Sequence, residues 1–112
     1  MTLKTKWAGY ICVFSTAPDM TEAERIADAL VTEKLVACVT LFPEVKSVYW
    51  WKDEIQHSRE VTMMMKTRRK HLKVLEKRIN ELHPYEIPEI IAISLYRGSE
   101  EYLNWIYTSV KP

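Results

Sequence analysis

One histidine stands beside carboxylates in a proline-rich stretch, and this combination is the strongest metal-ligand signal in the sequence. The stretch reads HPYEIPE; it begins at His83 and carries Glu86 and Glu89. Imidazole suits copper and zinc, but tight sites take three or four ligands, and the candidates for the additional ligands are Glu86, Glu89, Asp19 and a cysteine. The competing interpretation, which we favour, is that His83 caps or packs against the end of a helix.

A lysine at the end of an apolar strand-like run suggests a second site. Lys66 follows three methionines, so we expect it to be partly buried, and a buried lysine needs a carboxylate partner or its pKa falls. Four residues could converge on it in a cleft between subunits: Trp51, Glu60, Tyr85 and Glu89. One interpretation is a site for an anion or small metabolite. The other, slightly favoured, is an ion pair that sets the strand register.

Aromatic residues are concentrated in two places, around Trp50 and Trp51 and again around Trp105. Such residues can stack on nucleic-acid bases, but stacking platforms lie in basic grooves, and here the neighbouring charges are mixed. Tryptophan and tyrosine are also favoured anchors of protein interfaces. We therefore predict that Tyr49, Trp50, Trp51 and Trp105 lie in the interface of an oligomer.

Composition excludes several classes of protein. The chain has 112 residues and a net charge of +1, which predicts a single domain over 1–112 and no strong attraction to nucleic acid or to a membrane surface. It contains no apolar run long enough to span a bilayer. No signal peptide is recognised, so a cytoplasmic location is expected. His57 and His71 stand among charged residues, and we expect both to be exposed and without a role.

The sequence favours a protein without catalytic activity. It contains neither a nucleophile-elbow string nor a paired His-x-x-x-His. Ser15-Thr16 with His83 is the only conceivable nucleophile–base pair, and nothing in the sequence brings them together. Cys12 and Cys38 lie in apolar strand-like runs, where we expect buried, reduced thiols. No cofactor is expected to be required, and copper or another divalent cation is the candidate ligand.

Hydrophobic periodicity and capping signals predict the elements. Asp19 with Glu22 three residues on forms a capping box for the first helix, and Thr67 and Ser99 are the expected caps of the next two. Pro43 is expected to bend the hairpin that lies between the first and the second helix. The expected elements are a strand over 9–15, a helix ending near 34, hairpin arms over 36–51 and 54–66 with the turn at 52–54, a second helix, a strand over 90–96 and a third helix.

This order predicts the fold class. A β-α-β-β-α-β sequence with a terminal helix is the α+β, ferredoxin-like arrangement, an antiparallel sheet with helices on one face. An arm of about 15 residues reaches roughly 50 Å, too far for a domain of this size to cover. The apolar hairpin tip and the second face of the sheet would then stay exposed unless other subunits cover them. We therefore expect an obligate oligomer.

Several motifs together resemble the CutA family, the divalent-cation tolerance proteins. The resemblance covers nearly the whole chain and rests on HPYEIPEII from His83, STAPD from Ser15, AC at 37–38, SVYWW from Ser47, KT at 66–67 and YLNWI from Tyr102. It implies a ferredoxin-like homotrimer whose hairpins wrap the neighbouring subunits, similar in architecture to PII signalling proteins. It also implies a link to tolerance of divalent metals, copper above all, with weak metal binding as the expected mode. The alternative is a PII-like signalling or adaptor trimer that binds a small anion or a partner protein in its clefts.

Two features depart from the family pattern. Many members have glycine in the hairpin turn where this chain has Asp53, which tolerates a positive φ less well. Some members have a cysteine and a pair of histidines that are implicated in copper binding. The matching positions here are Ser15, Leu82 and His83, so only His83 of that set remains.

Overall fold

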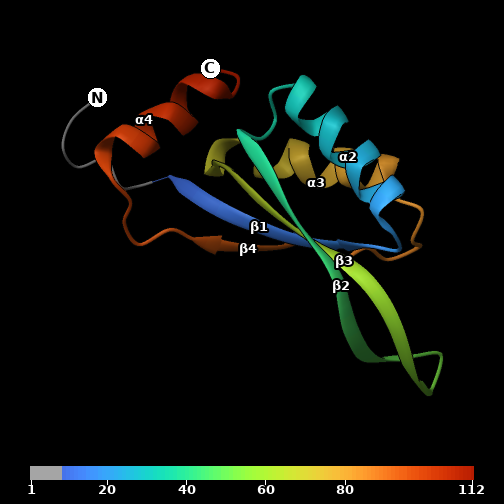
Figure 1. Ribbon diagram of the computed structural model, residues 1–112. Coiled ribbons are helices and arrows are strands. Elements are labelled where there is room, and N and C mark those ends of the chain that lie inside the picture. Colours follow the sequence, from blue (N-terminus) through green and yellow to red (C-terminus); the bar gives the residue numbers. More distant parts are fainter. Residues whose placement is uncertain (1–8) are drawn as a thin grey trace.

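A computed structural model describes residues 9–112, and their fold is of the predicted α+β class (Figure 1). Its strands are β1 (Tyr10–Ala17), β2 (Cys38–Trp51), β3 (Glu54–Arg68) and β4 (Ile91–Ser94), and its helices are α2 (Met20–Thr32), α3 (Leu72–Leu82) and α4 (Glu100–Ser109), with a 3₁₀ turn over Arg69–His71. None of the helices in this described part has the length and hydropathy that a membrane span needs.

The four strands form one antiparallel sheet in the order β2-β3-β1-β4. β1 and β3 are central, as expected from the continuous apolar run in β1, which is buried along most of its length. β4 is an edge strand of only four residues and is shorter than predicted.

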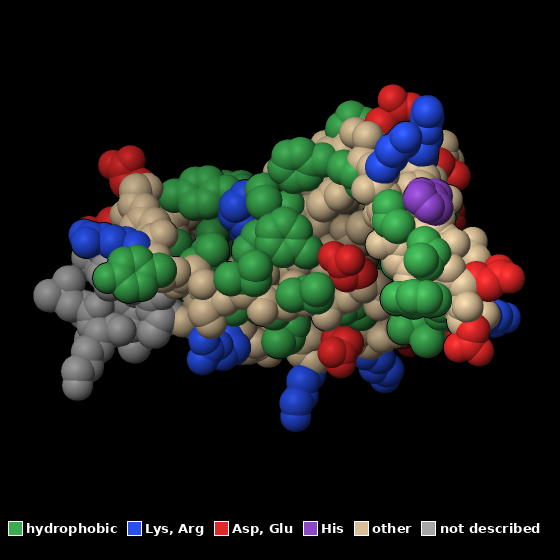
Figure 2. Space-filling view, turned by 90° about the horizontal axis from the view of Figure 1, so that it is seen from below, with side chains coloured by type: hydrophobic (Ala, Val, Ile, Leu, Met, Phe, Trp, Pro, Cys, Tyr) green, Lys and Arg blue, Asp and Glu red, His purple; other side chains and the backbone are tan. Residues whose placement is uncertain are grey.

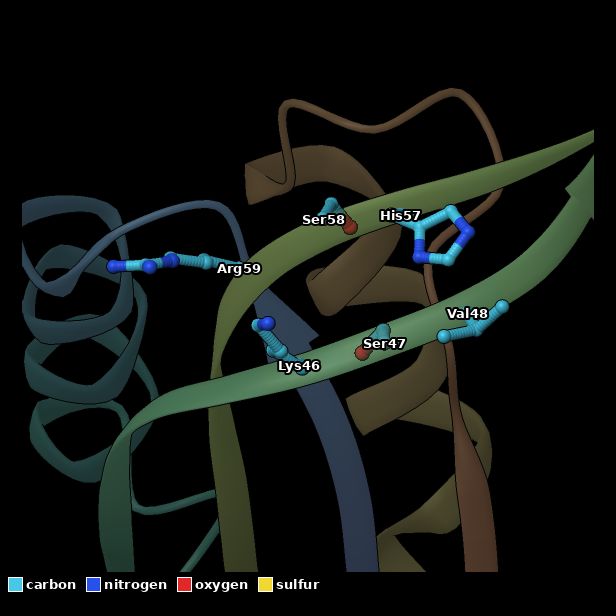
Figure 3. A pocket seen from close by; sticks show the side chains of 6 residues that line it. All are labelled: Lys46, Ser47, Val48, His57, Ser58 and Arg59. Atoms are coloured by element: carbon cyan, nitrogen blue, oxygen red, sulfur yellow. The ribbon is translucent and has the colours of Figure 1, made fainter.

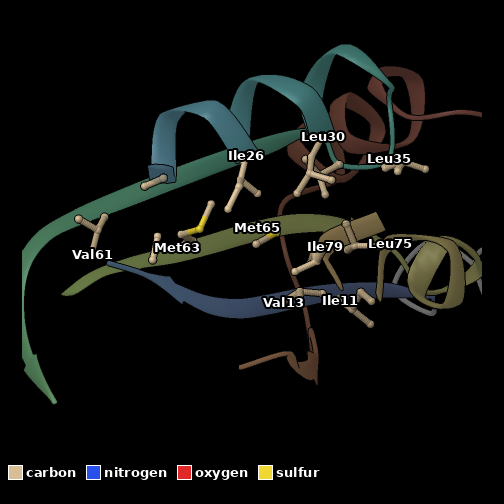
Figure 4. Packing of buried hydrophobic residues seen from close by; sticks show 13 residues of the cluster. Ile11, Val13, Ile26, Leu30, Leu35, Val61, Met63, Met65, Leu75 and Ile79 are labelled. Atoms are coloured by element: carbon tan, nitrogen blue, oxygen red, sulfur yellow. The ribbon is translucent and has the colours of Figure 1, made fainter. Parts of the chain in front are cut away.

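Helices α2 and α3 cover one face of this sheet (Figure 1). Figure 4 shows Ile26 and Leu30 of α2 and Ile79 of α3 directed at the strands, where Met63 and Met65 are fully buried. The methionines therefore fill the core, as the alternation along their strand predicted. Helix α4 builds a second, smaller cluster at the end of the sheet, from Tyr10, Ala37, Leu103, Ile106 and Val110.

Two of the three predicted helix caps are confirmed. An oxygen of Asp19 accepts from the Glu22 amide at 2.8 Å, and the Ser99 hydroxyl accepts from the Tyr102 amide at 3.2 Å. The prediction for Thr67 was wrong, because β3 continues through it. Its buried hydroxyl instead donates to the Leu35 carbonyl at 2.7 Å, which ties the end of β3 to the chain that leaves α2.

The β2–β3 hairpin has the predicted arms but a tighter turn. Trp51 pairs with Glu54, so the loop consists of Lys52 and Asp53 alone, with φ of 51° and 62°. Two positive φ values in a two-residue loop define a type I′ turn, whose twist matches that of the strands, and Asp53 takes the left-handed conformation that glycine favours. The predicted bend near Pro43 is a bulge, where the register shifts between Phe42 and Val45.

The hairpin extends well beyond the helices (Figure 1). The molecule measures 50 × 25 × 23 Å and has a radius of gyration of 14.9 Å, against about 13 Å for a compact chain of 100 residues. Hydrophobic side chains remain exposed along the hairpin and on the helix-free face of the sheet, where they gather in Figure 2. Those exposed by more than half are Val48, Trp50, Ile55, Ile91 and Ile93.

One histidine was wrongly expected to be exposed. His71 is buried, and its Nε2 lies 2.8 Å from the carbonyl oxygen of Lys111. Burial, together with the nearby positive charges of Lys70 and Arg68, holds the pKa of its imidazole below the usual 6.5. His57, by contrast, is exposed as predicted.

This burial predicts a loss of stability in mild acid. As the pH falls through 6.5, the unfolded chain binds a proton at residue 71 before the folded chain does, so the free energy of unfolding decreases. We expect chemical denaturation between pH 7.5 and pH 5 to show this decrease, and His71→Gln to flatten it. The matched control, His57→Gln, should retain the wild-type slope. An equal slope in His71→Gln would contradict the assignment.

Candidate functional site

A hollow of about 830 Å³ lies between the hairpin and the segment that follows α3, within the usual size range of small-molecule sites. The hairpin lines one side of it and the 84–89 segment lines the other. Its walls come from Thr16 of β1, Ser47, Val48, Tyr49, Trp50 and Trp51 of β2, Glu60 of β3, and Pro84, Tyr85, Glu86, Ile87 and Glu89.

His83 holds the 84–89 segment in place. It ends α3 as the C-cap residue, and its amide donates to the Ile79 carbonyl at 2.8 Å. Its ring is buried and turns toward β1, where Nε2 lies 2.6 Å from the Thr16 carbonyl oxygen, while Nδ1 accepts from the Tyr85 amide at 3.1 Å. An Nδ1 that accepts requires the proton on Nε2, which therefore donates to Thr16.

This arrangement does not fit a preformed metal centre. Both ring nitrogens of His83 are already engaged in hydrogen bonds, so neither is free to bind a metal ion. Among residues 9–112, no three side chains of the ligand-bearing types His, Cys, Asp and Glu converge as a metal ion needs. The packing interpretation of His83 accounts for the geometry, and its role as a ligand stays a prediction.

Glu60 and Tyr85 form the polar centre of the hollow. Glu60 is only 6% exposed, and its Oε2 accepts a hydrogen bond of 2.9 Å from the Tyr85 hydroxyl. Burial, with the adjacent Glu60 carboxylate, raises the pKa of Tyr85 far above its usual 10.0, so its hydroxyl keeps its proton and remains a donor.

The predicted site divides into two places. Four of its residues line the hollow: Trp51, Glu60, Tyr85 and Glu89. Lys66 does not lie with them, because it is six residues from Glu60 along β3, a separation of roughly 20 Å. The prediction that Lys66 is partly buried is confirmed, since it is half-buried. The prediction of its neighbours was wrong.

Lys66 instead lies between the two cysteines at the other end of the sheet. It pairs in register with Cys12 on β1 and with Cys38 on β2, and its Nζ lies 5.9 Å from the centre of the Tyr102 ring. Cys12 is buried as predicted, and burial raises the pKa of its thiol. Cys38 is only half-buried, and its Sγ lies 3.8 Å from the Tyr102 hydroxyl.

The predicted interface residues occupy the hairpin and α4. Trp50 is 71% exposed, whereas Trp51 is half-buried at the hollow, and the Tyr49 hydroxyl accepts from Ser58 at 3.2 Å. Trp105 is partly exposed and packs against Tyr102. Their place in an interface stays a prediction.

A second hollow, of about 260 Å³, lies along the hairpin and has a different character. Figure 3 shows Lys46, His57 and Arg59 extending from its two strands, with Arg59 directed away from the other side chains. Arg59 has a carboxylate partner, Glu44 at 3.7 Å, and both are largely exposed. Exposed pairs of this kind contribute little to stability.

Sequence reasoning did not place Tyr49, Trp50 and Glu86 at the hollow. For Tyr49 the alternation of side chains along the strand was a signal, because it places Tyr49 on the same face of the hairpin as Trp51. Glu60 lies on that face too, but this follows only from the strand register, in which it pairs with Val45. The bulge before Val45 hides this register from the sequence. Glu86 lies in an irregular segment, where no periodicity applies.

The fold and the hollow define a class: a ferredoxin-like α+β protein with an overlong hairpin. Residues 11–109 match the family model of the CutA1 divalent ion tolerance protein. The chain therefore belongs to the CutA1 family, as its motifs suggested.

Individual relatives agree with this assignment. The chain is 40% identical to a divalent-cation tolerance protein CutA of Pyrococcus horikoshii, over 90% of this chain and 98% of that one. It is 35% identical to a chloroplastic CutA protein of Arabidopsis thaliana over 99% of this chain, but it spans only 61% of that relative's length. The crystal structure of CutA from Xylella fastidiosa matches with a TM-score of 0.90 and 39% identity, over 93% of this chain and all of that one.

The Glu60–Tyr85 contact can be tested by its contribution to stability. Tyr85→Phe removes the donor to a buried carboxylate, so we expect it to lower the free energy of unfolding by about 1–3 kcal/mol. The matched control is Tyr49→Phe, which removes a hydroxyl from an exposed pair and should change stability by less than about 0.5 kcal/mol. Chemical denaturation measures both, and equal effects would show that the buried contact has no special weight.

Proposed function

We propose that this protein contributes to tolerance of divalent cations as a homotrimer without catalytic activity, built like PII signalling proteins. Membership of the CutA1 family supports the link to divalent cations. The observation that carries the proposal of an assembly is the exposed hairpin, on which Trp50 is 71% exposed. Monomeric proteins rarely leave such apolar surface uncovered.

A non-catalytic role is consistent with the surroundings of the one conceivable nucleophile. Ser15 is fully buried, and its hydroxyl approaches the Thr16 carbonyl at 3.5 Å. His83 contacts the same carbonyl through Nε2 and has no proton acceptor free for a serine. A cytoplasmic location remains part of the proposal, although the Arabidopsis relative is described as chloroplastic and the Archaeoglobus fulgidus one as periplasmic.

Copper, or another divalent cation, would bind weakly according to this proposal. To coordinate through Nε2, His83 would have to give up its hydrogen bond to Thr16, and that loss lowers the affinity. The exposed carboxylates of Glu86 and Glu89 stand on the same segment. The anion-binding alternative is less well supported, because Lys66, the positive charge that was predicted to bind the anion, lies at the other end of the sheet.

The assembly predicts one dominant species in solution. Sedimentation at micromolar concentration should give a mass near three times the chain mass of 13.2 kDa. Trp50→Glu should shift this species toward smaller ones, because a charge at a buried interface costs several kcal/mol. Val74→Glu is the matched control, an exposed apolar residue on α3, and should change nothing. A well-folded monomer of the unmodified chain would reject the proposal.

Metal binding is tested separately by calorimetric titration of copper(II). The unmodified protein should show weak, saturable binding, and His83→Ala should weaken it further. His57→Ala, which removes an exposed imidazole, is the control for non-specific surface binding. Circular dichroism must first show that His83→Ala remains folded. Equal affinities of the two variants would reject His83 as a ligand.

A further inference from the structure

We propose that the hollow between the hairpin and the 84–89 segment binds a small organic cation, an ammonium or guanidinium compound, with Glu60 as its counter-ion and aromatic rings as its walls. This ligand differs from the divalent metal of the proposed function, and the inference does not depend on metal binding.

The charge of the hollow points to a cation. Three carboxylates line it, from Glu60, Glu86 and Glu89, and none of the lysines, arginines and histidines within residues 9–112 does. None of the three belongs to an ion pair within residues 9–112. The described residues therefore neutralise none of these carboxylates through an ion pair, and the nearest cation noted at a wall residue is Lys52, whose Nζ lies 5.8 Å from the centre of the Trp51 ring.

Glu60 is the carboxylate for which the lack of a positive partner is least favourable. Its side chain is more than nine-tenths buried and lines the hollow. One oxygen accepts from the neutral hydroxyl of Tyr85, and no described residue donates a hydrogen bond to the other, which remains open to the hollow. A buried carboxylate is normally paired with a positive charge, because burial without one is unfavourable. The free oxygen of Glu60 is the place where such a charge would be stabilised.

The walls select the kind of cation. Tyr49, Trp51 and Tyr85 line the hollow, and Tyr49 and Trp51 lie on the same face of the hairpin as Glu60. Faces of tryptophan and tyrosine attract ammonium and guanidinium groups, and sets of such rings recognise organic cations. The aliphatic part of an amine can also pack against Ile87, in the wall formed by the 84–89 segment.

A metal ion and an anion fit less well. The carboxylates do not converge closely enough with other ligands to hold one metal ion, whereas an organic cation is long enough to contact charges that stand apart. An anion would meet only like charges.

The test uses the full chain in its assembled state and three small probes. Agmatine carries a guanidinium and an ammonium group, putrescine carries two ammonium groups, and 1,4-butanediol is the neutral counterpart of putrescine. Calorimetry and tryptophan fluorescence at pH 7.5 should show saturable binding of at least one of the two amines and none of the diol. Added salt should weaken this binding moderately, because the charges are partly screened.

Substitutions locate the binding. Glu60→Gln keeps the shape and the acceptor for Tyr85 but removes the charge, and we expect it to weaken binding at least tenfold. Trp51→Leu should weaken it several-fold. The matched control is Glu44→Gln, which removes an exposed carboxylate of the hairpin outside this hollow and should leave binding unchanged.

Three outcomes would overturn the inference. One is the absence of binding by either amine at millimolar concentration. Another is equal binding in Glu60→Gln and Glu44→Gln, which would indicate non-specific attraction to the surface. The last is dissociation of the assembly in Glu60→Gln together with no binding by the unmodified protein, since a cation from a neighbouring subunit would then occupy the hollow.

Discussion

The length of the β2–β3 hairpin is the constraint on which the rest of this structure depends. Helices α2 and α3 cover only the part of the sheet that includes β1, and the paired strands continue beyond them (Figure 1). In the overhang the two strands pair only with each other, so their outward-facing backbone groups and the hydrophobic side chains at the tip, such as Trp50, gain no cover from their own subunit. Both the proposed assembly and the hollow under the hairpin follow from this overhang.

The hollow exists because two rigid parts of the chain face each other across the overhang. His83 fastens one of them, the 84–89 segment, to the end of β1 through the Thr16 carbonyl. The Tyr85 hydroxyl then links this segment to Glu60 on the hairpin at 2.9 Å. His83, which resembles a metal ligand in the sequence, therefore positions the 84–89 segment in the structure. The negative charge it helps to position belongs to Glu60, whose nearest described partner is neutral.

Much of the fold could be predicted from local patterns. The apolar run of β1, the capping box at Asp19 and the two arms on either side of Lys52-Asp53 each depend on neighbouring residues only. Where a distant contact decided the outcome, prediction failed. Thr67 resembles a helix cap but donates to Leu35, and His71 has charged neighbours in sequence yet is buried against the carbonyl of Lys111.

The sequence by itself determined the order of elements, the α+β class, the overlong hairpin and the family, because periodicity, caps and motifs are properties of short stretches. Only the tertiary structure decided that Glu60 meets Tyr85 while Lys66 stands with Cys12 and Cys38. The physical reason is strand register: a bulge and six residues of extended chain separate Glu60 from Lys66 along one strand. Their charges therefore act in different places, although nothing in the sequence distinguishes them.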